Sequence, residues 1–209
     1  MAGQARFMPL KATQAFTVKG NTMKKEFSVT LLAALLLAGT SAGYAGAPDP
    51  ERIQEARQQT RAFAEDLKST LMKGMKAEGP KAAIRLCNEE APVIAMSHST
   101  DGWDIGRTSL KIRNPENAPD AWEKQVLLDF ASRHQAGESM DTMEASIQDG
   151  DTFRYMKAIP VGGPCVICHG ETLAEPVQEE LARLYPDDKA TGFRQGDLRG
   201  AFTLTYTSD

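Results

Sequence analysis

The stretch GGPCVICHGE, residues 162–171, places two cysteines three residues apart and a histidine directly after the second. Cys-x-x-Cys-His is the attachment signature of c-type haem, in which two thiols bond to the haem edge and the histidine coordinates the iron. The Gly-Gly-Pro turn before the motif favours a tight bend that presents both sulfurs on one side. The sequence therefore predicts one covalent haem c on Cys165 and Cys168, with His169 as the proximal iron ligand.

Two other chemistries use similar residues. Cys87, Cys165, Cys168 and a histidine could complete a Cys3His zinc site, and a Cys-x-x-Cys pair can exchange disulfides. Cys168 and His169 are adjacent, however, which makes it difficult for both to reach one small ion. No thioredoxin-like strand-helix pattern surrounds the motif. Haem is the favoured interpretation.

The amino-terminal part of the chain has the three-part layout of a secretory signal peptide. Two lysines follow Met23, an apolar run covers residues 27–38, and small residues lead to a cleavage site expected after Ala45. The apolar run is shorter than the roughly 20 residues that span a bilayer, so an uncleaved membrane anchor is the lesser alternative. We interpret residues 1–45 as leader plus signal peptide, with Met23 as the true start.

Export implies that residues 46–209 form one periplasmic c-type haem-binding domain. The hydrophobic fraction of 41% and the charged fraction of 25% are ordinary for a soluble globular protein. Acidic residues outnumber basic ones, 28 to 24, and the predicted leader is itself basic, so the exported part is more acidic still. Such a domain is a poor nucleic-acid binder, because phosphate binding needs clustered positive charge.

Hydrophobic periodicity predicts an α+β domain with two long amino-terminal helices. The second helix, from Pro80, carries Cys87 on the same apolar face as Ile84 and Ile94, and Pro92 is expected to kink or end it. Residues 138–152 show no clear pattern. The other expected elements are a first helix from residue 49 to about 77, helices at 119–134 and 175–184, and strands at 103–112, 153–161 and 200–207.

The second axial ligand remains open from the residues alone. No methionine follows His169, although in small electron-carrying cytochromes a methionine downstream of the motif is the usual ligand. Cys87 is either a ligand or a small buried residue, and His98 is the reserve ligand. The further candidates are His134, Met96, Met140, Met143 and Met156. For the two haem propionates, the candidate cationic partners are Arg113, Arg154 and Arg199.

Four further stretches are distinctive: Leu86-Cys87-Asn88, IRNPENAPDAWE at 112–123, Pro160 before the motif, and GFRQGDLRGAFTL at 192–204. With these features the chain resembles a known family of c-type haem domains with a PAS-like fold, which occur alone in periplasms and as ectodomains of sensor histidine kinases and chemotaxis receptors. The resemblance covers residues 50–209. It implies an antiparallel sheet with amino-terminal helices, and iron held by the motif histidine and by a cysteine from an early helix, here His169 and Cys87.

These features predict a periplasmic mono-haem protein that acts as a redox or small-gas sensing module and passes its signal to a separate partner protein. A periplasmic electron-transfer cytochrome is the alternative, with its own redox partner. A peroxidase-like enzyme is a third possibility, which a six-coordinate resting iron argues against. We therefore expect a binding protein and not an enzyme.

Overall fold

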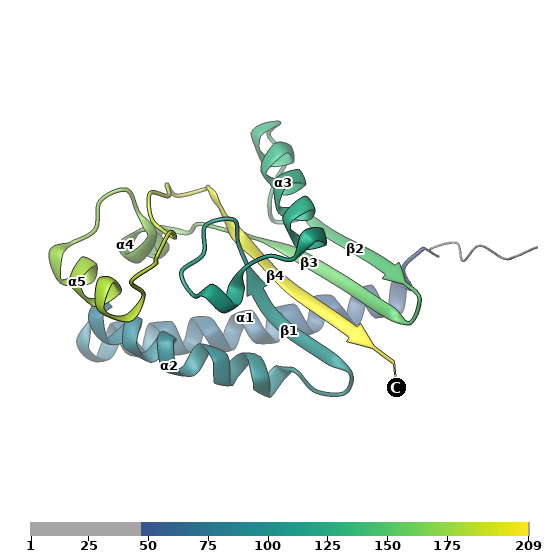
Figure 1. The fold of residues 1–209 in the computed structure, drawn as a ribbon, viewed down its shortest axis with the longest axis horizontal. Coiled ribbons are helices and arrows are strands. Elements are labelled where there is room, and N and C mark those ends of the chain that lie inside the picture. The colour runs from purple at the N-terminus through teal and green to yellow at the C-terminus, as the bar shows by residue number, and fades with distance from the viewer. Residues whose placement is uncertain (1–46, 209) are drawn as a thin grey trace, which may run out of the picture. The chain divides into compact units, whose positions relative to one another are not determined.

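Two long helices, α1 (Pro50–Glu78) and α2 (Pro80–His98), form a hairpin along one side of the molecule (Figure 1). The computed structural model describes residues 47–208, so the leader and signal peptide predicted for residues 1–45 lie outside the described part. Asp49 caps α1 by accepting a hydrogen bond from the Glu51 amide. Gly79 separates the helices with a φ of +80°, which favours glycine.

The second helix does not end at Pro92, because α2 continues through Pro92 to His98; the expected kink stays a prediction. Proline removes one backbone donor, but the remaining hydrogen bonds and the packing of Ile94 and Ala95 against the sheet core hold the last turns. Ser99 then closes the helix by donating its amide to the Ala95 carbonyl.

A four-stranded antiparallel sheet lies beside this hairpin, in the order β1-β4-β3-β2. The sequence did not indicate β2, because residues 144–149 lack a clear alternation of apolar and polar side chains. β2 pairs with β3 through a hairpin turn at Gly150, whose φ is +56°. The strands are β1 (Trp103–Thr108), β2 (Glu144–Asp149), β3 (Thr152–Pro160) and β4 (Leu198–Thr207).

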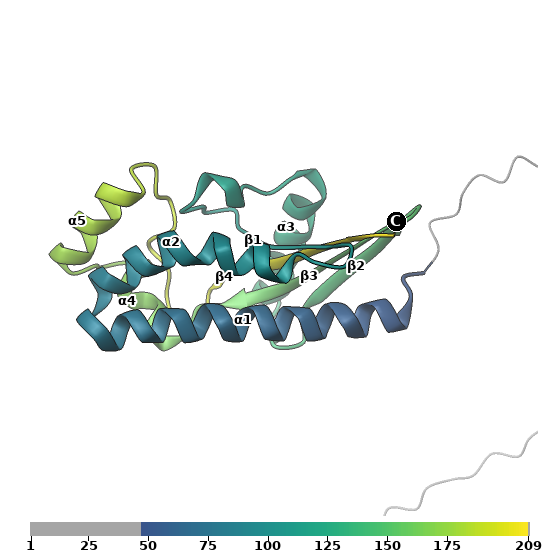
Figure 2. The ribbon, with the colours of Figure 1, turned by 90° about the horizontal axis from the view of Figure 1, so that it is seen from below.

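The two faces of the sheet pack against different helices (Figure 2). Phe63 of α1 packs with Trp103, Ile105 and Leu204 on one face. On the other face, α3 (Ala121–Gln135) packs through Val126, Leu127 and Phe130. The α+β class and the antiparallel sheet are thus confirmed.

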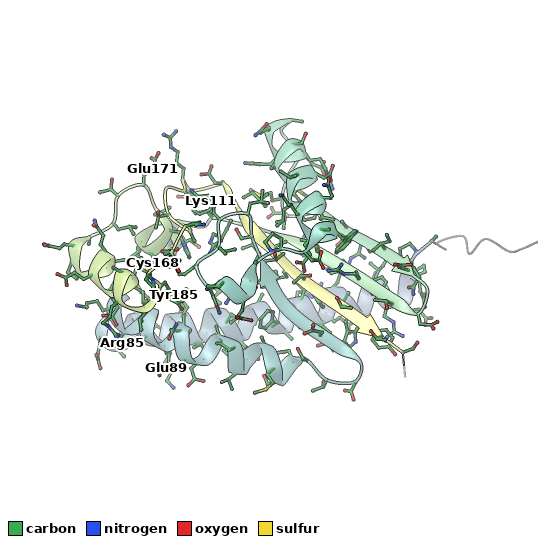
Figure 3. All side chains as sticks on the ribbon, viewed as in Figure 1. Arg85, Glu89, Lys111, Cys168, Glu171 and Tyr185 are labelled. Carbon is green, nitrogen blue, oxygen red and sulfur yellow. The ribbon has the colours of Figure 1, made fainter. Side chains whose placement is uncertain are left out.

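The Cys-x-x-Cys-His segment lies at the end of the sheet where β3 finishes and β4 begins. A short 3-10 helix, η1 (Pro115–Asn117), follows β1. A second 3-10 helix, η2 (Gly163–Cys165), leads directly into the short helix α4 (Val166–His169), and α5 (Glu175–Leu184) follows. Val177 and Leu181 of α5 pack on Ile84 of α2, which brings the motif beside the helix that carries Cys87. Figure 3 shows Cys168 and Tyr185 close together in this region. Across residues 47–208, none of the helices has both the length and the apolar character to span a bilayer.

The close packing of the hairpin depends on Gly74. A Cβ atom at this position would lie 2.7 Å from the Cα of Ala83 in α2, which is closer than real contacts allow. Valine has a higher intrinsic helix propensity than glycine, so propensity alone predicts that Gly74→Val stabilises α1. We expect instead that the clash lowers the free energy of unfolding by about 1–3 kcal/mol, measured by urea denaturation.

The matched control is Ala77→Val, at an exposed position of the same helix, which should change the free energy of unfolding by less than about 0.7 kcal/mol. Equal effects of the two substitutions would contradict the close-packing explanation.

Candidate functional site

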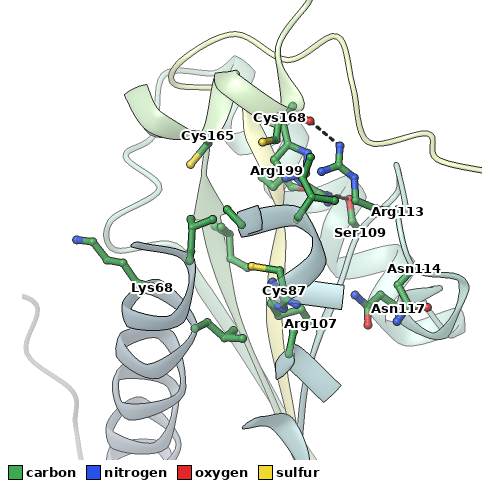
Figure 4. A pocket seen from close by; sticks show the side chains of 18 of the residues that line it. Lys68, Cys87, Arg107, Ser109, Arg113, Asn114, Asn117, Cys165, Cys168 and Arg199 are labelled. Atoms are coloured by element: carbon green, nitrogen blue, oxygen red, sulfur yellow. Dashed lines mark hydrogen bonds between the residues drawn. The ribbon is translucent and has the colours of Figure 1, made fainter. Parts of the chain in front are cut away.

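A cavity of about 520 Å³ opens where α1, α2 and the ends of β1, β3 and β4 meet the cysteine motif. This volume lies in the range of roughly 300–1,000 Å³ that is typical of small-molecule and cofactor sites. Its walls are mainly apolar, with side chains from both long helices and from the motif (Figure 4). The apolar lining includes Leu67, Leu71, Met72, Met75, Ala83, Ile84, Ala91, Ile112, Ile159, Ile167 and Phe202.

The motif contributes Cys165, Cys168 and His169 to this cavity together. Positions three residues apart in a helical turn point to the same side, which explains how one short segment presents both thiols. The backbone of the turn is fixed from outside: the Phe193 amide donates to the His169 carbonyl at 3.0 Å. Gly170 also allows a close approach, because a Cβ there would lie 2.4 Å from the Val166 carbonyl oxygen.

His169 is held in a defined orientation by the loop that follows α5. Its Nδ1 lies 2.6 Å from the Ala190 carbonyl oxygen, so Nδ1 carries the proton and donates it. Nε2 then keeps its lone pair, the arrangement that metal-ligating histidines adopt. Burial, together with the charges of Arg113 and Arg199, lowers the pKa of His169 to about 3. The imidazole is therefore neutral at physiological pH, as a metal ligand must be.

Cys87 of α2 lines the same cavity as the motif. Figure 4 shows it beside Arg107, with the two motif cysteines on a separate wall. Burial raises the pKa of the Cys87 thiol, and the charges of Arg107 and Arg113 act in the opposite direction. Cys87, Cys165 and Cys168, all within the described residues, form no disulfide with one another. Cys87 is therefore a half-buried thiol facing the cavity and not a residue enclosed in the core.

Arg113 braces the motif from behind. Its Nη2 donates to the Cys168 carbonyl at 2.5 Å and its Nε donates to Asp188 Oδ2 at 3.0 Å. The Arg113 and Asp188 side chains are only 13% and 9% exposed. The guanidinium thus links the motif, the loop after α5 and the segment after β1, and its charge is already balanced by a carboxylate.

Arg199 has neutral partners. Its Nη1 donates to Ser109 Oγ at 3.0 Å and to the Lys111 carbonyl at 3.1 Å. Burial, then the charges of Arg113 and Arg107, lower the pKa of Arg199 to about 10. It lines the cavity, so its charge is available to an anionic group there.

Two residues singled out from the sequence lie elsewhere. Arg154 faces the α3 side of the sheet, where it pairs with Asp120 at 2.6 Å and stacks on Trp122. His98 ends α2 about three helical turns from Cys87 and lies 2.8 Å from Asp66. Neither lines the cavity. The structure therefore does not bring either of them to the site for which it was predicted.

The other candidate ligands from the sequence also lie away from the cavity. Met140, Met143 and Met156 are buried in the core beneath α3, and Met96 is 70% exposed. His134 is in the last turn of α3. Two methionines that the sequence did not single out, Met72 and Met75 of α1, do line the cavity.

Arg107 is the main residue that sequence reasoning missed. It lines the cavity beside Cys87, and in residues 47–208 its guanidinium has no hydrogen-bond or ion-pair partner. Burial lowers the pKa of Arg107, although the nearby Cys87 and Tyr185 raise it. The sequence does contain a sign of this role. Arg107 lies on the same face of the strand as Trp103 and Ile105, because alternate residues of a strand point to one face. Both of those residues are buried, so a cationic side chain on that face is unusual.

The last alternative from the sequence is a zinc ion bound by the three cysteines and a histidine. Within the part of the chain that the structure describes, no three histidine, cysteine or acidic side chains are placed to hold one metal ion. The Cys3His zinc alternative is therefore unsupported.

A family model described as Tll0287-like matches residues 50–206. The chain belongs to the Tll0287-like family. Among solved structures, the crystal structure of the cyanobacterial haem protein Tll0287 is similar, with 26% sequence identity and a TM-score of 0.56. The match covers 78% of this chain and 98% of that one. A search of curated proteins gave no significant match. The family match spans α1 to β4 and thus includes Cys87 and the cysteine motif.

Proposed function

We propose that residues 46–209 form a periplasmic mono-haem c-type domain with a PAS-like fold. Cys165 and Cys168 attach the haem, His169 is one axial ligand and Cys87 is the other. The observation that carries the proposal is the convergence of these four side chains on one apolar cavity, with His169 Nδ1 committed to the Ala190 carbonyl. The similarity to a cyanobacterial haem protein supports it.

The charged residues around the cavity fit a haem with two carboxylates. Lys68, Arg107 and Arg199 line the cavity and have no carboxylate partner in residues 47–208, so two of these three cations can neutralise the two haem carboxylates. Arg113, a candidate propionate partner from the sequence, is better explained as the brace that holds the Cys168 carbonyl near Asp188. Arg154 has no part in this assignment.

A bound haem supplies one-electron chemistry and an iron that exchanges ligands. Residues of the chain would control both the redox chemistry and the ligand exchange of the iron. His169 stays oriented through Ala190. Burial raises the pKa of the Cys87 thiol, while the charges of Arg107 and Arg113 act in the opposite direction and favour the thiolate. A cysteine thiolate stabilises ferric iron and is released more easily when it is protonated. We propose a redox or small-gas sensing module in which loss of Cys87 shifts α2.

The helix that carries Cys87 is mechanically connected to the sheet. At the end of α2, Ser99 Oγ accepts a hydrogen bond from the Ile105 amide of β1 at 2.9 Å. A displacement of α2 at the cavity can therefore reach the exposed edge strand, where a partner protein in the periplasm could detect it.

Electron transfer is the second candidate function. The observation that favours it is an apolar rim at the cavity mouth, where Met72 and Ile167 are 37% and 38% exposed. Peroxidase-like chemistry has less support, because the cavity lining in the described chain has no carboxylate and no histidine other than His169 to serve as a distal acid or base.

Hydrogen exchange of the haem-loaded protein separates the two functions. If Cys87 release is the signal, reduction should increase amide exchange in α2 near residue 87 and at the Ser99–Ile105 contact, with α3 unchanged as the internal control. An electron carrier should show the same exchange in both oxidation states, because reorganisation slows electron transfer. Identical α2 exchange would contradict the sensing proposal.

A further inference from the structure

The cavity differs in charge from the rest of the chain. Its lining contains four cationic side chains and, within the described residues, no aspartate or glutamate. The chain as a whole has a net charge of −4. The cationic residues are Lys68, Arg107, Arg113 and Arg199.

One of these charges is balanced within the protein. Arg113 pairs with Asp188 at 2.9 Å. Arg199 donates to neutral oxygens. Arg107 and Lys68 have no ion-pair partner in residues 47–208. If the haem of the proposed function is bound, its two carboxylates neutralise at most two of the remaining three cations, so positive charge is left at this site.

Arg107 is the cation best placed to act at the position of Cys87. It projects from β1 on the side of the sheet that faces α2, and Figure 4 shows it beside Cys87. The Arg107 side chain is half-buried, and a guanidinium that is partly removed from water without a partner is costly. An anion at hydrogen-bond distance would satisfy it. An entering neutral ligand would leave Arg107 unpaired.

We propose that the external ligand of this site is a small anion of the hydrosulfide, cyanide or nitrite class, with Arg107 as its binding residue. The proposal rests on the haem-binding function proposed above. With haem bound, the iron would accept a lone pair from the anion, and the Cys87 sulfur would leave with its own pair and take a proton from solvent. The oxidation state of the iron would not change.

Arg107 has one competing role, as a partner of a haem carboxylate. The two roles predict different ligand selectivity. If Arg107 binds the entering anion, its removal weakens anionic ligands specifically. If it is occupied by a haem carboxylate, its removal has similar effects on anionic and neutral ligands.

The test is a titration of the ferric, haem-loaded protein with azide as the anion and imidazole as the neutral probe, at pH 8 and constant ionic strength. For Arg107→Gln, we expect azide affinity to fall about 10- to 100-fold, the loss typical of a hydrogen bond to a charged group, and imidazole affinity to stay within about twofold. Arg107→Lys should recover part of the azide affinity. Arg154→Gln, the matched arginine outside the cavity, should change neither.

Three results would overturn the inference: no azide binding by the wild type, azide affinity unchanged in Arg107→Gln, or equal loss of both ligands. Failure of the haem proposal itself would appear differently, because the purified protein would then lack a haem absorption spectrum before any titration.

Discussion

Purified Cys165→Ser/Cys168→Ser protein should carry no covalent haem, whereas the wild type made with haem-maturation machinery should carry one. Both thiols line the cavity, and in the proposed attachment each would form a bond to one vinyl group of the haem. Serine keeps the size but is not a comparable nucleophile for this addition. Mass spectrometry of the denatured protein measures the result, because it detects covalent attachment alone.

The matched control is Cys87→Ser, which changes the third cysteine of the same cavity and should retain the full haem mass. Each single motif variant should lose most of the adduct. Wild-type protein that carries stoichiometric zinc and no haem after co-expression with the maturation machinery would refute the haem proposal.

Much of the fold could be predicted from the sequence because its signals are local. Asp49-Pro50 marks the start of α1 through a cap that the structure retains, and β4 follows the β-branched and aromatic residues at 200–207. β2 could not be predicted in this way. Glu144 lies on it as the partner of Arg57 and Tyr155, so its place depends on contacts with distant parts of the chain.

The candidate site also combines residues that the local sequence identifies with residues that only the fold brings together. Cys165, Cys168 and His169 are contiguous, and their spacing alone predicts that they act together. Arg113, Arg154 and Arg199 are spread along the chain, and the sequence gives each of them the same charge. Only the fold shows that Arg113 is paired with Asp188, that Arg154 lies under α3, and that Arg199 reaches the cavity.

The prediction that the second helix could end at Pro92 failed because contacts with distant parts of the chain outweighed a local signal. A proline in a helix has a local cost of about 3 kcal/mol, but tertiary packing can offset it. α2 is held by the Gly74–Ala83 approach to α1 at one end and by Ile94 against the sheet at the other. The helix therefore continues past Pro92, and Cys87 and the C-cap residue Ser99 belong to one helical element.

Cys87→Ser should change the ferric spectrum of the haem-loaded protein more than any other single substitution outside the motif. We expect the wild type to show a low-spin spectrum with sulfur-to-iron charge-transfer bands. Serine removes the thiolate, so these bands should disappear and high-spin iron should replace the low-spin form. The reduction potential should rise, because a thiolate stabilises ferric iron relative to neutral ligands. Absorption and electron paramagnetic resonance spectra, with a redox titration, measure these changes.

The identity of any replacement ligand tests the geometry of the site. Met72 and Met75 line the cavity, so a methionine-ligated spectrum in Cys87→Ser would be compatible with the structure. A bis-histidine spectrum would not, because His98 is about three turns away along α2 and pairs with Asp66. The control is Met96→Leu, an exposed position on the same helix, which should leave the spectrum as in the wild type. If Cys87→Ser also leaves the ferric spectrum unchanged, Cys87 is not a ligand, the α2 switch has no trigger, and a simple electron carrier becomes the better description of the protein.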